Sequence, residues 1–430
     1  MTKYIILIFF LLVNQCSFNS NSKFWTEEKK IEILPKNFKR ISNEDKITAK
    51  EFNKDLLIEI PKDFFNNFDQ LSNNLEIINL KMDIKNSSKF RFSKIKNFEY
   101  FEPELVFDGN NFIFFDDKGN IIKFGRDFNI IWKKNFYTKQ EKKNKPILTF
   151  FIEKNILIVF DNLSKFYAID LLKGELIWSK KNENPFNSQI KIYDNKVYAI
   201  DMSNVLRCFS LKDGSELWKF QSENTFLKST KRNSLIINSG KIILNNSIGD
   251  IIAVDAKEGS LLWQIPTQNS LIYENAFSLV MSDLVADKKN IIFSNNRNEF
   301  YSLSLLNGLL NWKQKINSSV RPAFYDQFIF TISDEGYFFV IDYKTGNIIR
   351  ITDIFDLFSE KKRKNIKPIG FIVSSDKVIL STSNGRVLTI DIKDGKTKSV
   401  FKIDNERISR PFVFENKILL LKNNSIIKLN

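Results

Sequence analysis

Residues 167–178 read YAIDLLKGELIW, and related stretches return as RCFSLKDGSELW at 207–218, IAVDAKEGSLLW at 252–263 and YSLSLLNGLLNW at 301–312. In each stretch a glycine stands four residues before a tryptophan, in the pairs Gly174 and Trp178, Gly214 and Trp218, Gly259 and Trp263, Gly308 and Trp312. Glycine is scarce, with 14 among 430 residues. Its regular placement therefore indicates an internal repeat.

Three degenerate copies extend the repeat in both directions. FVIDYKTGNIIR and LTIDIKDGKTKS keep the glycine as Gly346 and Gly395, without the tryptophan. An earlier copy, IKFGRDFNIIW, keeps Trp132 but has Phe128 in place of the glycine. An aspartate four residues before the glycine (Asp170, Asp255, Asp342, Asp391) is suited to accept hydrogen bonds from the backbone amides of the turn.

Two other positions recur with the repeat. Ten residues before the glycine stand residues that tolerate the positive φ of a hairpin turn: Ser164, Asn204, Gly249, Asn298, Gly336 and Gly385. Prolines open most units: Pro103, Pro146, Pro185, Pro322, Pro368 and Pro411. The first and last of these prolines are 308 residues apart, or 44 residues per unit over seven steps. Runs such as KIILNN and KVILSTS between the markers are typical of strands, and this period is in the range of propeller blades.

The repeat predicts an all-β fold, a β-propeller of four-stranded blades in which tryptophan fills the space between neighbouring sheets. The units at the prolines, with two more beginning near Ser229 and Leu279, give eight blades, and seven is the alternative. The last unit holds only three strands. We expect the segment KFRFSKI (89–95) to supply the missing outer strand and so to close the ring over residues 88–430.

The first sixteen residues, MTKYIILIFFLLVNQC, indicate export from the cytoplasm. Lys3 precedes an apolar run of ten residues, which suits a secretory signal and is too short to span a bilayer. Val13 to Cys16 resembles a lipobox, although Gln15 stands where a small residue is usual. We therefore expect a signal peptide at 1–15, a lipid on Cys16 and a tether over 16–87. A plain signal peptide and an uncleaved anchor remain the alternatives.

Composition excludes several classes of function. No histidine occurs, so catalysis by Ser-His-Asp or Cys-His groups and His-rich zinc sites are excluded. Cys16 and Cys208 are the two cysteines, and Cys208 has the apolar context of a core residue. The net charge is +15. Because export places the chain away from nucleic acid, we expect no nucleic-acid partner. The basic run 361–364 is interpreted as a solvated loop, with an anionic membrane or acidic client as the alternative partner.

Repeats of the form A-x-D-x-x-x-G-x-x-x-W, as in YAIDLLKGELIW, resemble the PQQ-like propeller repeat over about residues 100–430. With the lipobox and eight units, the chain resembles the BamB family of outer-membrane β-barrel assembly lipoproteins. The resemblance implies a non-catalytic scaffold without a cofactor or metal, acting as a monomer within a complex. Its expected partners are the POTRA domains of a BamA-like barrel insertase and unfolded outer-membrane proteins. Its expected location is the periplasmic face of the outer membrane, and Ser17 after the cysteine fits that destination.

The same resemblance suggests partner-binding residues. The family binds its insertase through two consecutive loops, one with a Leu-x-Leu-Arg element and the next with an Asp-x-Asp element. The positions that match here are Leu227 and Lys228, in the loop after Trp218, and Asp283, in the loop after Trp263. Thr225 and Lys228 replace a leucine and the arginine, and lysine lacks the bidentate geometry of arginine.

Two alternative functions remain open. One is a different lipid-anchored periplasmic scaffold. The other is a PQQ-dependent dehydrogenase, which is disfavoured because such enzymes resemble each other in a vicinal disulfide and this chain has no adjacent cysteines. Acidic turns such as DDKGN (116–120) are interpreted as hairpin turns, because they lack the spacing of a calcium-binding loop.

Overall fold

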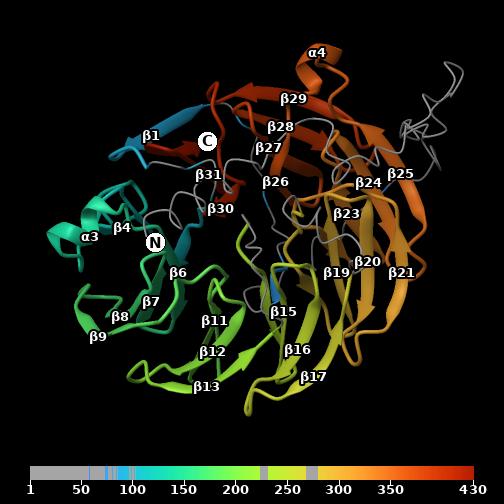
Figure 1. Cartoon of the computed structure of the whole chain (residues 1–430). Coiled ribbons are helices and arrows are strands. Elements are labelled where there is room, and N and C mark those ends of the chain that lie inside the picture. The colour runs from blue at the N-terminus through green and yellow to red at the C-terminus, as the bar shows by residue number, and fades with distance from the viewer. Residues whose placement is uncertain are drawn as a thin grey trace, which may run out of the picture. The chain divides into compact units, whose positions relative to one another are not determined.

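The computed structural model describes residues 103–222, 231–267 and 279–430, together with Ile58, 73–75, Leu80, Ile84, 86–95, Phe98 and Phe101. Eight antiparallel four-stranded sheets lie within the compact unit Ala49–Asn430 and are arranged as blades around a centre (Figure 1). The predicted eight-bladed propeller is confirmed, and the seven-bladed alternative is wrong. The predicted signal peptide (1–15), Cys16 and most of the predicted tether (16–87) lie outside the described residues.

The blades follow one another along the chain. The first blade consists of β2 (Val106–Asp108), β3 (Asn111–Phe115), β4 (Ile121–Phe124) and β5 (Ile130–Lys134), and the second of β6 (Leu148–Glu153), β7 (Ile156–Asp161), β8 (Lys165–Asp170) and β9 (Leu176–Lys181). The third blade consists of β10 (Lys191–Tyr193), β11 (Lys196–Ile200), β12 (Val205–Ser210) and β13 (Glu216–Gln221), and the fourth of β14 (Leu235–Asn238), β15 (Lys241–Asn245), β16 (Ile251–Asp255) and β17 (Leu261–Ile265).

The fifth blade consists of β18 (Val285–Ala286), β19 (Asn290–Asn295), β20 (Glu299–Ser304) and β21 (Leu310–Gln314), and the sixth of β22 (Ala323–Tyr325), β23 (Phe328–Ile332), β24 (Tyr337–Asp342) and β25 (Ile348–Asp353). The seventh blade consists of β26 (Pro368–Val373), β27 (Lys377–Thr382), β28 (Arg386–Asp391) and β29 (Thr397–Lys402), and the eighth of β30 (Phe412–Phe414), β31 (Lys417–Lys422), β32 (Ser425–Leu429) and β1 (Ser87–Arg91). Among the described residues, two short helices, α3 (Lys139–Lys143) and α4 (Glu360–Arg363), lie between blades. Among the described residues no helix is long and apolar enough to cross a membrane.

Within each blade the first strand is innermost, because the first strands of neighbouring blades contact each other, as β2 does β6 and β14 does β18. The two middle strands are buried along almost their whole length, as in β7 and β15. Such strands pack on both faces, which explains why they are continuous apolar runs in the sequence. The outer strands, such as β13, alternate between exposed and half-buried residues.

The residues predicted to form hairpin turns have the predicted positive φ. φ is positive at Ser164, Asn204, Gly249, Asn298, Gly336 and Gly385. Asp170 accepts hydrogen bonds from the amides of Leu172 and Lys173, which confirms its predicted role in the turn. Asp116 in the DDKGN segment likewise accepts from the amides of Lys118 and Asn120, as a hairpin-turn residue does.

The predicted closing strand is confirmed, although it begins two residues before the predicted segment 89–95. β1 covers 87–91 and pairs with β32, so that Phe90 lies opposite Ile426. The amides of Phe92 and Ile95 continue the pairing by donating to Asn424 and Asn423. The Phe90 ring packs against Phe124 of the first blade, with ring centroids 4.9 Å apart. An N-terminal strand therefore completes the eighth blade and joins it to the first.

Candidate functional site

The repeat glycines and tryptophans meet across the blade interfaces. A Cβ atom at Gly214 would lie 2.6 Å from the Trp178 ring, and one at Gly259 would lie 2.6 Å from the Trp218 ring. The same relation joins Gly174 to Trp132, Gly308 to Trp263 and Gly346 to Trp312. Gly395, whose preceding blade has no tryptophan, packs instead against Thr352 and Arg350. Because it has no Cβ atom, the glycine of one blade thus leaves room for the large side chain of the blade before it.

A β-bulge directs each tryptophan toward the glycine of the next blade. In seven blades the pairing of the third and fourth strands skips one residue, which stands immediately before the tryptophan position: Ile131, Ile177, Leu217, Leu262, Asn311, Ile349 and Lys398. A bulge increases twist and changes the direction of the next side chain. The indole of Trp178 then donates to the Leu211 carbonyl of the next blade (3.1 Å), and the Arg350 guanidinium donates to the Lys393 carbonyl.

Charged side chains gather at the centre of the ring, directly before or at the start of the first strands. They are Glu104, Lys191, Lys231, Arg232, Asp283, Arg321 and Arg410, here called the central cluster. Arg321 donates to Asp283 through Nε (2.8 Å) and also through its terminal nitrogen. Glu104 pairs with Arg232 and lies 3.5 Å from Arg410 and 3.7 Å from Arg321. Two carboxylates therefore join side chains from several blades.

Burial and neighbouring charges in the central cluster shift the pKa values of Glu104, Asp283 and Lys191. Burial alone would raise the pKa of Glu104, but Arg232, Arg410 and Arg321 lower it to about 2. Burial opposes ionisation of Asp283 as well, yet Arg321, Lys231 and Arg232 hold its pKa well below the usual range. Burial, with a contribution from Arg321, lowers the pKa of Lys191 to about 7. Both carboxylates are therefore ionised at neutral pH.

Two cavities adjoin the central cluster, one toward each face of the ring. The first, of about 810 Å³, is lined by residues of the segments that join one blade to the next, such as Ser188 and Ser319. We call this side the connection face. The second, of about 460 Å³, is lined by Glu104, Lys191 and Arg410 and by apolar residues of first strands such as Phe107 and Ile152. It lies toward the hairpins between first and second strands, which we call the turn face.

Asn74, from the segment before the propeller, is anchored at the second cavity. Its side-chain amide donates to Gln189 Oε1 (3.0 Å) and to the Leu284 carbonyl (2.9 Å), and its oxygen accepts from Lys191 Nζ (2.8 Å). These partners belong to the third and fifth blades. Leu80 exchanges two hydrogen bonds with the Ser374 side chain of the seventh blade. Residues that the repeat does not include thus join separate blades on the turn face.

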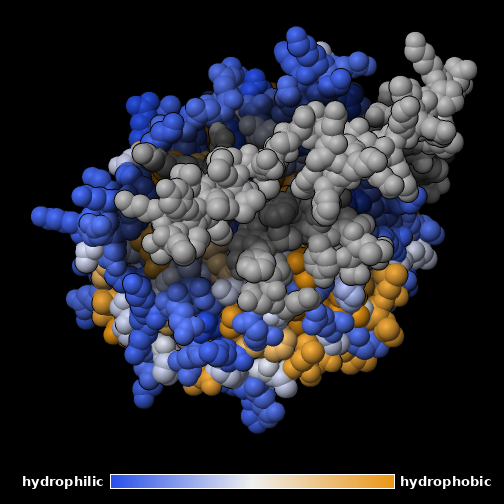
Figure 2. All heavy atoms as spheres, in the orientation of Figure 1, coloured by the Kyte–Doolittle hydropathy of each residue, from blue (hydrophilic) through white to orange (hydrophobic). Residues whose placement is uncertain are grey.

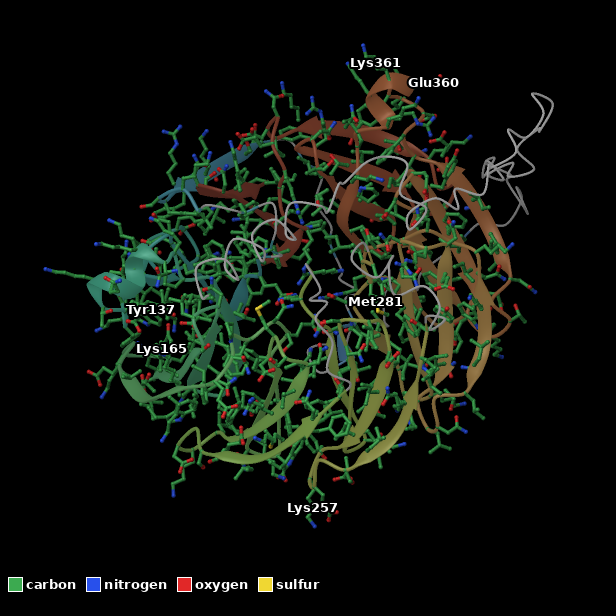
Figure 3. All side chains as sticks on the ribbon, in the orientation of Figure 1. Tyr137, Lys165, Lys257, Met281, Glu360 and Lys361 are labelled. Carbon is green, nitrogen blue, oxygen red and sulfur yellow. The ribbon has the colours of Figure 1, made fainter. Side chains whose placement is uncertain are left out.

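The residues predicted to bind a partner are only partly described. Leu227 and Lys228 lie outside the described residues. Asp283 is buried, and its carboxylate also accepts from Gln189 (3.2 Å). Met281, two residues earlier, is buried on the inner side of the ring (Figure 3). Their role in partner binding stays a prediction. The rest of the central cluster was not predicted from the sequence, although Glu104, Arg321 and Arg410 each adjoin a repeat proline, which is a usable signal.

Cys208 is a core residue, as expected. Its thiol is free and buried in β12. Burial raises the pKa of the Cys208 thiol to about 12, with Tyr198 opposing the shift through a hydrogen bond. At neutral pH the side chain is a thiol and not a reactive thiolate. Among the described residues no group of three or more histidine, cysteine, aspartate or glutamate side chains is placed to hold a metal ion.

Basic side chains lie on the connection face, outside the central cluster. Both short helices belong to segments that join one blade to the next, α3 between β5 and β6 and α4 between β25 and β26. The α3 segment 139–145 reads KQEKKNK, and the α4 segment 360–364 reads EKKRK. Arg363 pairs with Asp353 (2.7 Å), whereas Glu360 and Lys361 project outward at the margin of the ring (Figure 3).

Apolar side chains are exposed around the outer margin. They stand at the start of the outer strands of the first five blades, and we call them the apolar rim: Ile130, Ile131, Leu176, Ile177, Leu217, Leu261, Leu262, Leu309 and Leu310. Each is at least 44% exposed. Figure 2 shows apolar residues along the lower right margin of the molecule. Because exposed apolar side chains recur at the same position of five blades, the apolar rim is a candidate binding surface.

Comparison with known proteins agrees with this architecture. The family model described as outer membrane protein assembly factor BamB matches residues 117–352, which is more than half of the chain. An uncharacterized protein of Rickettsia prowazekii is 23% identical over 328 residues, covering 71% of this chain and 75% of that protein. The outer membrane protein assembly factor BamB of Moranella endobia is 21% identical over 272 residues, covering 63% of this chain and 68% of that protein.

Solved structures share the fold at low identity. The crystal structure of BamB from Moraxella catarrhalis has a TM-score of 0.63 at 13% identity and covers 80% of this chain and 100% of that chain. A quinohemoprotein alcohol dehydrogenase from Comamonas testosteroni has a TM-score of 0.59 at 8% identity, covering 81% of this chain and 76% of that chain. Both similarities concern the fold alone. On the family match, the chain belongs to the outer membrane protein assembly factor BamB family.

Proposed function

We propose that this protein is a non-catalytic scaffold of the outer-membrane β-barrel assembly machinery. It is anchored through a lipid on Cys16, faces the periplasm, binds the POTRA domains of a BamA-like insertase and assists delivery of unfolded outer-membrane proteins. The observation that supports this proposal most directly is the family match over residues 117–352. The mechanism is positional, since a rigid ring holds two partners close together.

The connection face is the proposed insertase-binding surface. Leu227 and Lys228 belong to the segment between β13 and β14, and Asp283 belongs to the segment between β17 and β18. Both segments join one blade to the next. Because the Asp283 carboxylate is buried against Arg321, its proposed role is to hold the segment between β17 and β18 in place for contact with the partner. The basic α3 and α4 segments on the same face favour an acidic partner surface.

The apolar rim is the proposed surface for unfolded clients. An outer-membrane strand presents alternating apolar side chains when unfolded, and these lose unfavourable water contact when they pack on Leu217, Leu261 and Leu262. The bulges before the tryptophans interrupt the outer edges of the sheets. Bulges limit edge-to-edge pairing between copies of a protein. Side-chain packing on the rim is therefore the proposed mode of client binding.

The proposal is tested by a cross-linking pull-down from intact cells of the native host, using tagged wild-type protein. The expected result is recovery of the barrel insertase. Recovery of a different envelope complex without the insertase would favour another lipid-anchored scaffold. Bound quinone absorbance, together with dye-linked oxidation of an alcohol or sugar, would favour the dehydrogenase alternative. Either result would contradict the proposal.

A further inference from the structure

The segment 354–367, which joins β25 to β26 and contains α4, projects from the margin of the ring (Figure 1 and Figure 3). We call it the α4 connection. Its base is fixed in the fold, because Phe355 and Ile366 are buried among apolar residues of the sixth and seventh blades. One terminal nitrogen of Arg363 also donates to both carboxylate oxygens of Asp353, each at 2.7 Å. The outward side chains of the α4 connection are therefore carried on a firmly held base.

The outward side of the α4 connection combines cations with an apolar side chain. Lys361, Lys362 and Lys364 are exposed, and among the described residues no acidic side chain forms an ion pair with them. Leu357 is 61% exposed. Residues 353–367 together hold five cationic and three acidic side chains, which leaves a net charge of +2. This surface is thus both positively charged and apolar.

A second basic element lies on the same face. Residues 138–145, which contain α3, hold four lysines and one acidic residue. Lys139 and Lys143 are exposed, whereas the Glu141 carboxylate accepts from the Thr138 amide (2.7 Å) within the helix cap. α3 follows the first blade and α4 the sixth, so the two basic elements stand apart on the margin of the ring (Figure 1). A broad, flat anionic surface matches this spacing, because it can contact both.

An anionic phospholipid bilayer has both properties that this surface requires. Its head groups are negatively charged, and each basic side chain near such a surface strengthens binding about fivefold. Its acyl boundary takes up an exposed leucine, while lysine side chains extend their ammonium groups to the head groups. A purely acidic protein surface offers only the charge.

We propose that the α4 connection docks on an anionic phospholipid bilayer, with Leu357 at the boundary between head groups and acyl chains and the three exposed lysines among the head groups. The margin of the connection face at the sixth and seventh blades is then turned toward the membrane. The segments proposed to bind the insertase follow the third and fourth blades, on another part of the ring. The proposed lipid on Cys16 keeps the ring near a bilayer, and in this respect the docking rests on the proposed function.

A fluorescent label at the position of Leu357 tests the docking. The full-length chain with Leu357→Cys, labelled with the environment-sensitive dye NBD, is reconstituted with vesicles of phosphatidylcholine or of phosphatidylcholine with about 30% phosphatidylglycerol. The Cys208 thiol is buried, and wild type treated in parallel gives the signal from any other labelled thiol. The emission is expected to rise at least about twofold with the anionic vesicles only, and about 0.5 M salt is expected to reverse the rise.

A second label position shows which face meets the membrane. Leu306→Cys replaces a leucine that is 73% exposed, in the turn between β20 and β21. Because the strands of a blade are antiparallel, this turn lies on the turn face, opposite the α4 connection. Its labelled form is expected to have the same emission with both vesicle compositions.

Matched lysine variants, each carrying the label at position 357, test the role of the charges. The triple variant Lys361→Gln, Lys362→Gln, Lys364→Gln is expected to lower the emission rise at least about fivefold. The control triple variant removes the same charge from three exposed turns on the turn face and is expected to keep the full rise: Lys173→Gln, Lys212→Gln, Lys257→Gln. Thermal unfolding checks that all variants are folded.

Three results would overturn the docking of the α4 connection. The first is unchanged emission of the label at position 357 with anionic vesicles. The second is an equal rise for the labels at positions 357 and 306, which would show adsorption without a preferred face. The third is an equal loss in the two triple variants, which would show a general effect of net charge. Sedimentation with neutral vesicles measures the proposed lipid anchor separately, so failure of the anchor and failure of the docking give different results.

Discussion

A contact between one tryptophan and one glycine determines how neighbouring blades fit together. Trp218 packs on Gly259 of the next blade, and the glycine has a φ of +75°. The residue therefore meets two requirements: a left-handed backbone and the absence of a Cβ atom. Both requirements explain why glycine, scarce elsewhere in the chain, recurs at this position.

A pair of glycine variants separates the two requirements. Gly240, in the hairpin between β14 and β15, has a φ of +73°, and a Cβ atom added there would have no neighbouring atom within 4 Å. Gly240→Ala is expected to lower the free energy of unfolding by about 1–2 kcal/mol through backbone strain alone. Gly259→Ala is expected to cost about 1–3 kcal/mol more, because its Cβ meets the Trp218 ring. Denaturant unfolding followed by tryptophan fluorescence measures both, and equal losses would show that the ring contact does not matter.

Glu104 makes stability depend on pH. Its pKa in the folded protein is about 2, below its ordinary value of 4.5. The ionised form is therefore favoured by folding, and its stabilisation is present above pH 4.5 and is lost as the pH falls toward 2. We expect Glu104→Gln to be less stable than the wild type by about 3 kcal/mol at pH 7, with the difference shrinking between pH 4.5 and 2.

The measurement is the midpoint of denaturant unfolding as a function of pH. Glu175→Gln, a matched change at an exposed residue in the turn between β8 and β9, is expected to follow the wild type. A constant difference between Glu104→Gln and the wild type across the acidic range would contradict the assigned ion pairs.

At the scale of elements, the segment before the propeller joins blades that are distant in sequence. Asn74 bonds to Gln189 and Leu284, while β1 completes the eighth blade. We expect Asn74→Ala to lower the free energy of unfolding by about 2–3 kcal/mol, because buried polar partners lose their hydrogen bonds. Asn73→Ala removes a single half-buried bond, to Asn238, and is expected to cost about 1 kcal/mol. Equal effects in the two variants would contradict the anchoring role of Asn74.

Most elements of the propeller follow from the sequence, because each blade is specified by local signals. The turn residues, the repeat glycines and the closing strand are all determined by spacing, and β1 begins only two residues before the predicted segment. The central cluster was not predicted, since Glu104 and Arg232 are 128 residues apart and meet only when the ring closes. The contact of each tryptophan with the next glycine was missed for the same reason, since it joins different units.

At the scale of the whole molecule, the ring separates two proposed surfaces. The connection face is basic at α3 and α4, and the apolar rim follows the outer strands of the first five blades. We expect the double variant Leu217→Ser, Leu262→Ser to bind an unfolded outer-membrane protein at least about fivefold more weakly than the wild type. Leu357→Ser changes an exposed leucine outside the rim and is expected to have no effect. Fluorescence anisotropy of a labelled, urea-diluted client measures the affinities, and equal binding by all three proteins would contradict the role of the rim.

The scaffold function is tested most directly by the affinity of the purified chain for the periplasmic domains of the host's barrel insertase. The account predicts saturable binding by the wild type and a loss of at least about tenfold in Lys228→Glu. Lys257→Glu, the same charge reversal at an exposed turn that points away from the centre of the ring, is predicted to bind as the wild type does (Figure 3). Absence of binding by the folded wild type would contradict the scaffold function. Equal losses in the two variants would contradict the proposed binding surface.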